Sequence, residues 1–173
     1  MGTLTLGLYN SYHPTEFQDA MRRAVARAAP VCIAFDCNLA TFGFPFAHAD
    51  KALTSPRAVA EFIATSTSIG GGEAIKQLAS ERRFRTYDFP QGMFPPQLGT
   101  PILTSERADG ETPRGVAQRL HNEDILLVLG LGPHGLPQVL FEGAETLEIT
   151  GKNVALETAT AMAALPALVH AYR

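Results

Sequence analysis

An apolar segment followed by closely spaced glycines constrains the fold of this chain most strongly. Residues 125–129 (ILLVL) are apolar without alternation, which is typical of a β-strand buried on both faces. Gly130, Gly132 and Gly135 follow at once, and glycine allows the backbone to turn sharply and to approach a ligand closely. Residues 146–150 predict a second strand, followed by a polar loop and a long helix. Two strand ends with glycine loops predict a ligand crevice at the carboxyl edge of an α/β sheet.

The rest of the chain alternates between predicted strands and helices. We expect strands at residues 3–9, 31–35, 84–89 and 101–105, and helices at residues 16–28, 57–65, 73–81 and 113–120. A strand, a helix and a strand in succession form a βαβ unit with a right-handed crossover. The alternation predicts an α/β fold, a mostly parallel sheet with helices on both faces, in a single domain spanning residues 1–173.

Composition excludes several classes of protein. Apolar residues make up 46% of the chain, which excludes a disordered protein, and no apolar run reaches the roughly 18 residues that a membrane-spanning helix needs. The first residues lack the basic and apolar blocks of a signal peptide. Cys32 and Cys37 do not indicate a disulfide framework. We therefore expect a cytoplasmic protein with no membrane partner.

The charge balance gives two alternatives for the cationic residues. A net charge of −3 argues by itself against a nucleic-acid-binding protein. Six of the fourteen Lys and Arg residues, however, fall in two groups, which are Arg22, Arg23 and Arg27 in a predicted helix and Arg82, Arg83 and Arg85 around a predicted strand start. The groups are either solvated faces or a track for an anionic partner.

The glycine turn matches a dinucleotide-binding motif, but its context does not fit. Residues 130–135 (GLGPHG) match G-x-G-x-x-G directly after a strand. That motif belongs to the first βα unit of a six-stranded domain, with an acidic residue at the end of the next strand. Here only one strand remains, the helix expected at 137–142 is short, and Glu148 lies inside the predicted strand. We therefore interpret the turn as something other than a nicotinamide site.

A different resemblance fits the order of the motifs. Residues 126–137 (LLVLGLGPHGLP) and 147–168 (LEITGKNVALETATAMAALPAL) resemble the last two motifs of the SPOUT superfamily of α/β-knot methyltransferases, most closely its SpoU branch. Residues 103–114 (LTSERADGETPR) resemble the strand and arginine-bearing loop one unit earlier. Residues 13–29 (HPTEFQDAMRRAVARAA) resemble the first motif, P-x-N-x-G-A-x-x-R, with its Arg at Arg22. The sequence as a whole also resembles an uncharacterised archaeal family placed near SPOUT.

The resemblance implies a fold, a cofactor and partners. It implies a C-terminal trefoil knot, S-adenosylmethionine as cofactor, tRNA or rRNA as substrate with methylation of a ribose oxygen or a base nitrogen, and a homodimer. The residues themselves do not support a metal site, because the five histidines are scattered in the sequence and the two cysteines have no second pair at zinc spacing. The cofactor would lie between three loops, and the residues implied for it are Thr104, Ser105, Leu129, Gly130, Gly132, Gly135, Ile149, Thr150, Gly151, Asn153, Val154 and Leu156.

Departures from the family pattern leave the chemistry open. Gly132 replaces the glutamate of G-x-E-x-x-G-L, while Glu16 and Glu157 replace asparagines. Arg22 could hold a phosphate, and Glu16 or Glu157 could accept a proton, so these three are the candidate catalytic residues. Glu157 could equally cap the last helix. The residues implied for RNA binding are Arg22, Arg23, Arg82, Arg83 and Arg85. A non-catalytic member that binds RNA, protein or a nucleotide-like ligand, and a doubly wound enzyme with a nucleotide cofactor, remain as alternatives.

Overall fold

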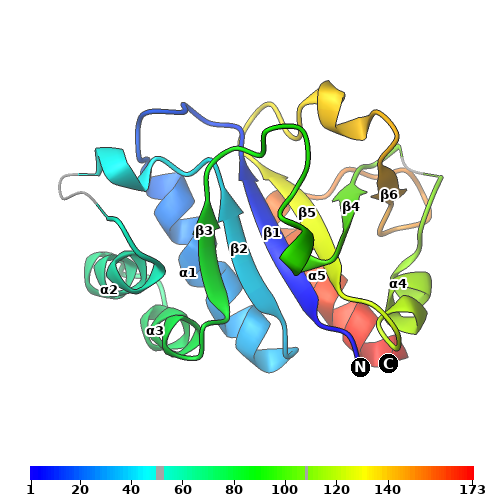
Figure 1. Cartoon of the computed structure of the whole chain (residues 1–173), viewed down its shortest axis with the longest axis horizontal. Coiled ribbons are helices and arrows are strands. Elements are labelled where there is room, and N and C mark those ends of the chain that lie inside the picture. Colours follow the sequence, from blue (N-terminus) through cyan, green and yellow to red (C-terminus); the bar gives the residue numbers. More distant parts are fainter. Residues whose placement is uncertain (50–52, 108) are drawn as a thin grey trace.

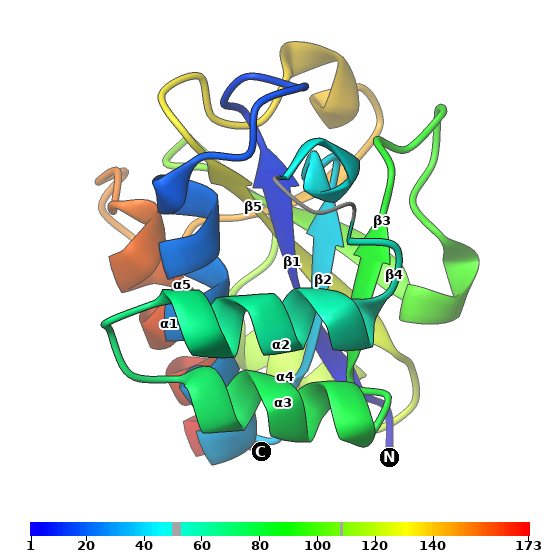
Figure 2. The ribbon, with the colours of Figure 1, turned by 90° about the vertical axis from the view of Figure 1, so that its left-hand side faces the viewer.

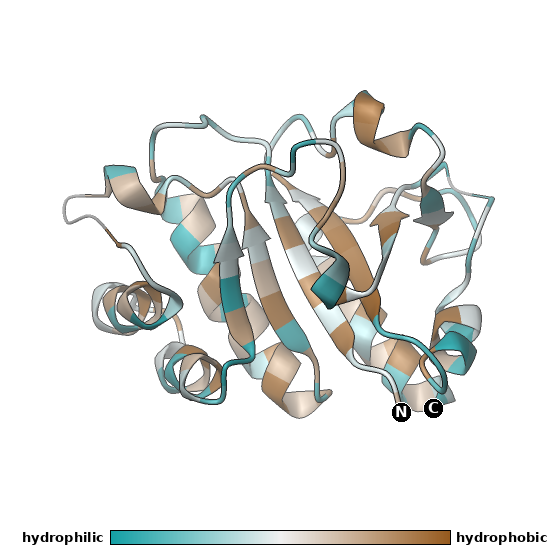
Figure 3. Cartoon of the chain, in the orientation of Figure 1, coloured by the Kyte–Doolittle hydropathy of each residue, from teal (hydrophilic) through white to brown (hydrophobic). Residues whose placement is uncertain are grey.

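A six-stranded, all-parallel β-sheet organises the chain in this computed structural model, which describes residues 1–49, 53–107 and 109–173 (Figure 1). The strand order is β3-β2-β1-β5-β4-β6. The strands are β1 (Leu4–Asn10), β2 (Asn38–Phe42), β3 (Phe84–Tyr87), β4 (Thr100–Thr104), β5 (Ile125–Leu131) and β6 (Glu145–Leu147). The central pair, β1 and β5, is apolar because both of its faces are covered (Figure 3).

The five α-helices all pack on one face of the sheet. They are α1 (Asp19–Ala34), α2 (Pro56–Ser66), α3 (Gly72–Ser80), α4 (Pro113–Arg119) and α5 (Thr158–Tyr172). Each contributes buried side chains to one core, which Leu4, Leu6 and Leu8 of β1 reach from the sheet. Figure 2 shows α1 and α5 on this side of the strands. No helix in the described ranges is long and apolar enough to cross a membrane.

The opposite face of the sheet is covered thinly, which corrects the prediction of helices on both faces. Its core, with Tyr9, Phe42 and Val128 among its buried members, packs under two 3-10 helices, η2 (Pro96–Leu98) and η3 (Gln138–Phe141), and their loops. Right-handed crossovers explain the division. The connections β1–β2, β2–β3 and β4–β5 run toward the β3 edge, while β3–β4 and β5–β6 run toward the β6 edge and therefore cross the other face. Only short helices form in those two connections.

The strand predicted at residues 31–35 is wrong, because residues 31–34 are the last turn of α1 and Phe35 is its C-cap. The second strand is β2, in a segment that the sequence predicted as a loop. The connection between two parallel strands has to return along the whole strand before it, and here α1 makes most of that return. The 16 residues of α1 span about 24 Å at 1.5 Å per residue, close to the roughly 23 Å of the seven-residue β1. A helix that ended at residue 28 would have left part of this return to a loop.

The predicted starts of two helices, α2 and α4, are confirmed by their caps, whereas the helix predicted from residue 16 begins at Asp19. The Ser55 Oγ accepts a hydrogen bond from the Ala58 N–H (3.2 Å), and the Thr112 Oγ1 accepts one from the Gly115 N–H (3.1 Å). The strand predicted to reach residue 150 ends earlier, with β6, and the helix expected at 137–142 is the 3-10 helix η3. The last helix, α5 (Thr158–Tyr172), continues past Pro166, although proline often kinks or ends a helix.

Candidate functional site

Three chain segments meet around a cavity of about 570 Å³ at the carboxyl edge of the sheet. They are the end of β4 with the residues after it, the glycine turn that follows β5, and the segment between β6 and the first turn of α5. These segments lie at the upper right of Figure 1. A cavity of this size falls in the range of small-molecule and cofactor sites.

Most residues implied for the cofactor line this cavity. Nine of the twelve do so, namely Thr104, Ser105, Leu129, Gly130, Gly132, Gly135, Ile149, Val154 and Leu156. The other three, Thr150, Gly151 and Asn153, lie in the loop after β6 without lining the cavity. Glu157, one of the candidate catalytic residues, lines the cavity from the N-cap of α5.

The glycine turn is folded tightly on itself and against the loop that follows β1. A Cβ added to Gly130 would lie 2.7 Å from the carbonyl carbon of Gly135. Gly132 has a φ of 125°, and a Cβ there would lie 2.8 Å from the Ser11 Oγ. Both positions therefore require glycine, which allows the turn to form one wall of the cavity. The Thr158 Oγ1 donates a hydrogen bond to the Gly130 carbonyl (2.7 Å) and ties the start of α5 to the same turn.

Glu148 is a cavity residue whose role the sequence did not predict. It is only 9% exposed, and its carboxylate accepts hydrogen bonds from the N–H (2.9 Å) and Oγ1 of Thr150 and from the N–H of Gly151. These bonds, that from the Thr150 hydroxyl first, hold the pKa of Glu148 below its usual value. An ionised carboxylate thus orders the loop and lines the cavity. The available signal was an acidic residue two positions before a Thr-Gly pair.

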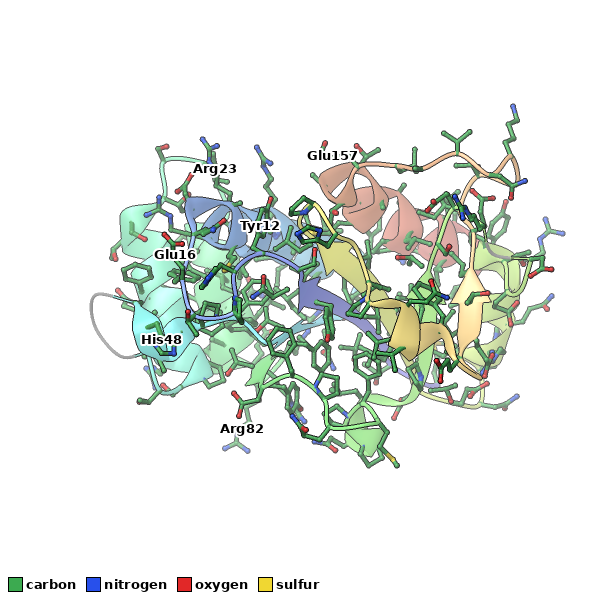
Figure 4. The ribbon with its side chains drawn as sticks, turned by 90° about the horizontal axis from the view of Figure 1, so that it is seen from above. Tyr12, Glu16, Arg23, His48, Arg82 and Glu157 are labelled. Carbon is green, nitrogen blue, oxygen red and sulfur yellow. The ribbon has the colours of Figure 1, made fainter. Side chains whose placement is uncertain are left out.

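The other two candidate catalytic residues line a second cavity. Glu16 and Arg22 belong to a space of about 390 Å³, whose lining also includes Asp19 and His48. Arg22 forms an ion pair with Asp19, which Arg23 also approaches at 3.2 Å. Seen from the carboxyl edge, Tyr12 lies between Glu157 on one side and Glu16 and His48 on the other (Figure 4).

The second arginine group lies away from Arg22. Arg83 donates hydrogen bonds to the carbonyls of Cys32 (3.1 Å) and Cys37 (2.8 Å), near the amino end of β2, and pairs with Asp36 and Glu81. Arg82 precedes β3 at the same edge of the sheet, and Arg85 is exposed within β3. Because α1 begins near the carboxyl ends of the strands, the structure does not bring these arginines together with Arg22 and Arg23.

The cysteines and the possible metal ligands form no further centre in the described part of the chain. Cys32 and Cys37 are unpaired and buried, and burial raises the pKa of both thiols, that of Cys37 to about 12. Across residues 1–49, 53–107 and 109–173, no three His, Cys, Asp or Glu side chains are grouped to hold a metal ion.

Sequence comparison places the chain among proteins of one family. Residues 4–170 match the family model described as "Protein of unknown function (DUF531)". The uncharacterised protein MJ0224 of Methanocaldococcus jannaschii is 40% identical over 174 residues, which cover 98% of this chain and 94% of that protein.

Solved structures with the same fold include several methyltransferases. TrmJ from Z. mobilis ZM4 matches all of this chain and 70% of its own, with a TM-score of 0.59 and 14% identity. The A. aeolicus TrmH/SpoU tRNA modifying enzyme matches 100% of this chain and 76% of its own, with a TM-score of 0.58 and 15% identity. The AdoMet-bound rRNA methyltransferase from Sinorhizobium meliloti matches 97% of this chain and 56% of its own, with a TM-score of 0.51 and 12% identity. At these identities the likeness shows the fold alone, and it confirms the SPOUT-like fold.

Proposed function

This chain belongs to the DUF531 family. We propose that it is an S-adenosylmethionine-dependent RNA methyltransferase. The observation that carries the proposal is the cavity of about 570 Å³, which nine of the twelve residues implied for the cofactor line. The solved structures that share the fold include a tRNA-modifying enzyme and an AdoMet-bound rRNA methyltransferase. A cavity of this size at the carboxyl ends of the strands, in the same fold, supports the same kind of ligand here.

The residues of the cavity fit S-adenosylmethionine. Leu129, Ile149 and Leu156 provide apolar surface for an adenine ring, and the glycine turn exposes backbone polar groups without side chains in the way. Glu148 and Glu157 place carboxylates in the wall, which favour a ligand with cationic groups. When bound, this cofactor supplies a methyl group activated by its sulfonium centre.

The chain's own residues would then position the acceptor and remove its proton. Much of the rate can come from holding donor and acceptor in line. Arg22 would hold a phosphate of the RNA, with Arg23 next to it on α1, and Glu157, which lines the cofactor cavity, would take the proton from the attacking oxygen or nitrogen. Glu16 lines the second cavity with Arg22, so it would serve as the proton acceptor only for a cofactor bound to the other copy of a dimer. The proposal does not use Arg82, Arg83 and Arg85. Arg83 donates hydrogen bonds to backbone carbonyls near the amino end of β2, away from the cofactor cavity.

We also propose that the chain is one knotted domain over residues 1–173. Leu147 accepts a hydrogen bond from the Ser105 N–H (3.0 Å) on the β4 side, and Thr146 accepts one from the Glu111 N–H (2.7 Å) on the other side. β6 thus lies between β4 and the segment that follows β4 in sequence. This supports passage of the chain after β6 through that loop, as a trefoil knot. An experimental structure in which the chain after β6 does not pass through the loop that follows β4 would contradict the knot.

A cytoplasmic homodimer is the third part of the proposal. Met162, Leu165 and Val169 of α5 are buried in the chain's own core, while Ala159, Ala163 and Ala167 remain half-buried and carry no charge. An uncharged outer helix face favours cover by a second copy related by a two-fold axis. Light scattering that gives a monomer at micromolar concentration would refute the dimer.

Transfer of a labelled methyl group tests the proposed function. Purified protein incubated with methyl-labelled S-adenosylmethionine and unmodified bulk tRNA and rRNA should label RNA. Nuclease digestion and chromatography of the product would then distinguish a methylated ribose from a methylated base. Cofactor binding without label in any RNA fraction would refute the catalytic part.

A non-catalytic, ligand-binding member is the alternative, and one observation favours it. The family motif has a glutamate where this chain has Gly132. The φ of 125° and the closeness of the Ser11 Oγ leave no room for that side chain here. This alternative predicts binding of S-adenosylmethionine with no transfer to RNA.

A further inference from the structure

The second cavity combines aromatic rings, tilted relative to one another, with hydrogen-bonding groups. Its volume is about 390 Å³, and it lies between the loop after β1, the start of α1, the 3-10 helix η1 (Phe46–His48) and α2. The Phe17 ring contacts those of Phe46 (5.3 Å between centroids) and Phe62 (5.9 Å). Phe17 and Phe62 are half-buried and line the cavity. Half-exposed aromatic rings offer a stacking surface for another flat ring.

The polar groups of this cavity offer both a donor and an acceptor. The Nε–H of Arg22 is buried and has no hydrogen-bond partner, which costs free energy unless a ligand supplies an acceptor. Asp19 is neutralised by Arg22 and Arg23. Glu16 also lines the cavity, is exposed, and forms no ion pair within the described ranges, so it leaves a carboxylate for ligand donors.

From these groups we propose that the second cavity binds the base of a guanine nucleotide. Guanine alone among the four RNA bases presents two adjacent N–H donors, N1 and N2, which one carboxylate can accept together. Adenine and cytosine place a ring-nitrogen acceptor next to their amino group, and a carboxylate repels it. Arginine is also the side chain that most often reads the O6 and N7 acceptors of guanine. Glu16 would read the donor edge and the Arg22 Nε–H an acceptor, with the base stacked on either Phe17 or Phe62, whose rings are tilted by 54° to each other. With the base in this cavity, Arg23 is the arginine left for the phosphate and Glu157 the carboxylate left to accept the proton.

The position of this cavity links it to the proposed function. The loop after β1 lines the second cavity at Thr15 and Glu16 and contacts the glycine turn of the first cavity at Ser11. Asn10 fixes this loop, since its Nδ2 donates a hydrogen bond to the Gly43 carbonyl (2.9 Å) and its Oδ1 accepts one from the Tyr12 N–H (2.8 Å). That the guanine belongs to an RNA substrate rests on the proposed function, whereas the binding of guanine does not.

Binding of nucleotides to the full chain tests the inference. GMP, AMP, CMP and UMP are titrated into ¹⁵N-labelled protein and followed by the amide shifts of His48 and Phe62. GMP should bind about tenfold more tightly than the other three, as expected for one bidentate base contact. Two RNA pentamers, UUGUU and UUAUU, separate the sources, since an RNA substrate predicts tighter binding of UUGUU than of GMP.

Two variants make the test specific. Glu16→Gln keeps the shape of the side chain but removes its charge, and should abolish the preference for GMP. Glu73→Gln makes the same change at an exposed site on α3 and should preserve it. Equal binding of the four nucleotides, a preference for CMP, or a preference that survives Glu16→Gln would overturn the guanine assignment. GMP binding equal to or tighter than UUGUU would overturn the RNA source. Calorimetry with S-adenosylmethionine, measured separately, tells whether the proposed function has failed instead.

Discussion

Replacing Arg119 with methionine removes the centre of a four-residue charge cluster behind the candidate cofactor site. Arg119, at the end of α4, donates to Glu123 (2.6 Å), Glu111 (3.3 Å) and Glu145. Glu145 is the first residue of β6, whose last residue, Leu147, lines the cavity. The cluster therefore joins α4, the segment before it and the edge strand. Methionine keeps most of the packing of the side chain and removes every one of these bonds.

The loss of stability follows from the burial of the cluster. An exposed ion pair contributes about 0.2–1 kcal/mol, while breaking a buried pair costs about 3–5 kcal/mol. The Arg119 side chain is 24% exposed and its three partners are 23–48% exposed, so the cluster lies between these limits. We expect a loss of about 2 kcal/mol, or about 4–8 °C in Tm for a chain of this length.

The difference between wild type and variant should depend on pH. Hydrogen bonds from Arg119 first, and then from Thr100, hold the pKa of Glu123 below its usual value. Because the folded-state pKa of Glu123 lies below its unfolded value, the ionised carboxylate contributes its full stabilisation of the folded state above the unfolded pKa of about 4.3. This stabilisation is lost as the pH falls through the lower, folded-state pKa of Glu123. The difference should therefore be full at pH 7 and shrink below about pH 4.

Urea unfolding followed by circular dichroism, at pH 7 and at a series of acidic pH values, measures both quantities. Arg107→Met is the matched control, because Arg107 is 89% exposed and its ion pair with Glu106 is 3.9 Å long. The control should change the free energy of unfolding by less than about 0.5 kcal/mol. An Arg119→Met protein as stable as the control, or a difference that does not change with pH, would refute the reasoning.

Three further substitutions test separate parts of the account. Gly130→Ala places a Cβ 2.7 Å from Gly135, so calorimetry should show S-adenosylmethionine affinity at least about tenfold weaker, and unchanged affinity would contradict the turn's role. Arg22→Ala should abolish methyl transfer to RNA while leaving cofactor affinity nearly unchanged; lower thermal stability with intact activity would make Arg22 a purely structural ion-pair partner. Ser55→Ala removes the cap of α2 at the Ala58 N–H and should cost about 1 kcal/mol by urea unfolding, with no effect on cofactor binding.

The sequence predicted the elements whose signals are local. Ser55 and Thr112, each followed by proline, marked the starts of α2 and α4, and the unbroken apolar run of β5 marked a strand covered on both faces. The segment after Pro30 was misread because proline usually ends a helix and the residues that follow it are apolar. The need to return along the whole length of β1 overrode that local signal.

The candidate site was predicted in part for the same reason. Glycines report backbone geometry directly, so Gly130, Gly132 and Gly135 placed the turn. The hydrogen bonds of Glu148 depend on where β6 ends, which the sequence placed three residues too late. Thin cover of the second sheet face was also hidden, because it follows from the strand order and not from any single segment.

Isothermal titration calorimetry with S-adenosylmethionine tests the central claim most directly. The wild-type chain should bind one cofactor per protomer, Gly130→Ala should bind it at least about tenfold more weakly, and Arg22→Ala should retain the wild-type affinity. A folded wild-type chain that gives no heat of binding with either S-adenosylmethionine or S-adenosylhomocysteine would contradict the assignment of the cavity at the carboxyl edge as a methyl-donor site.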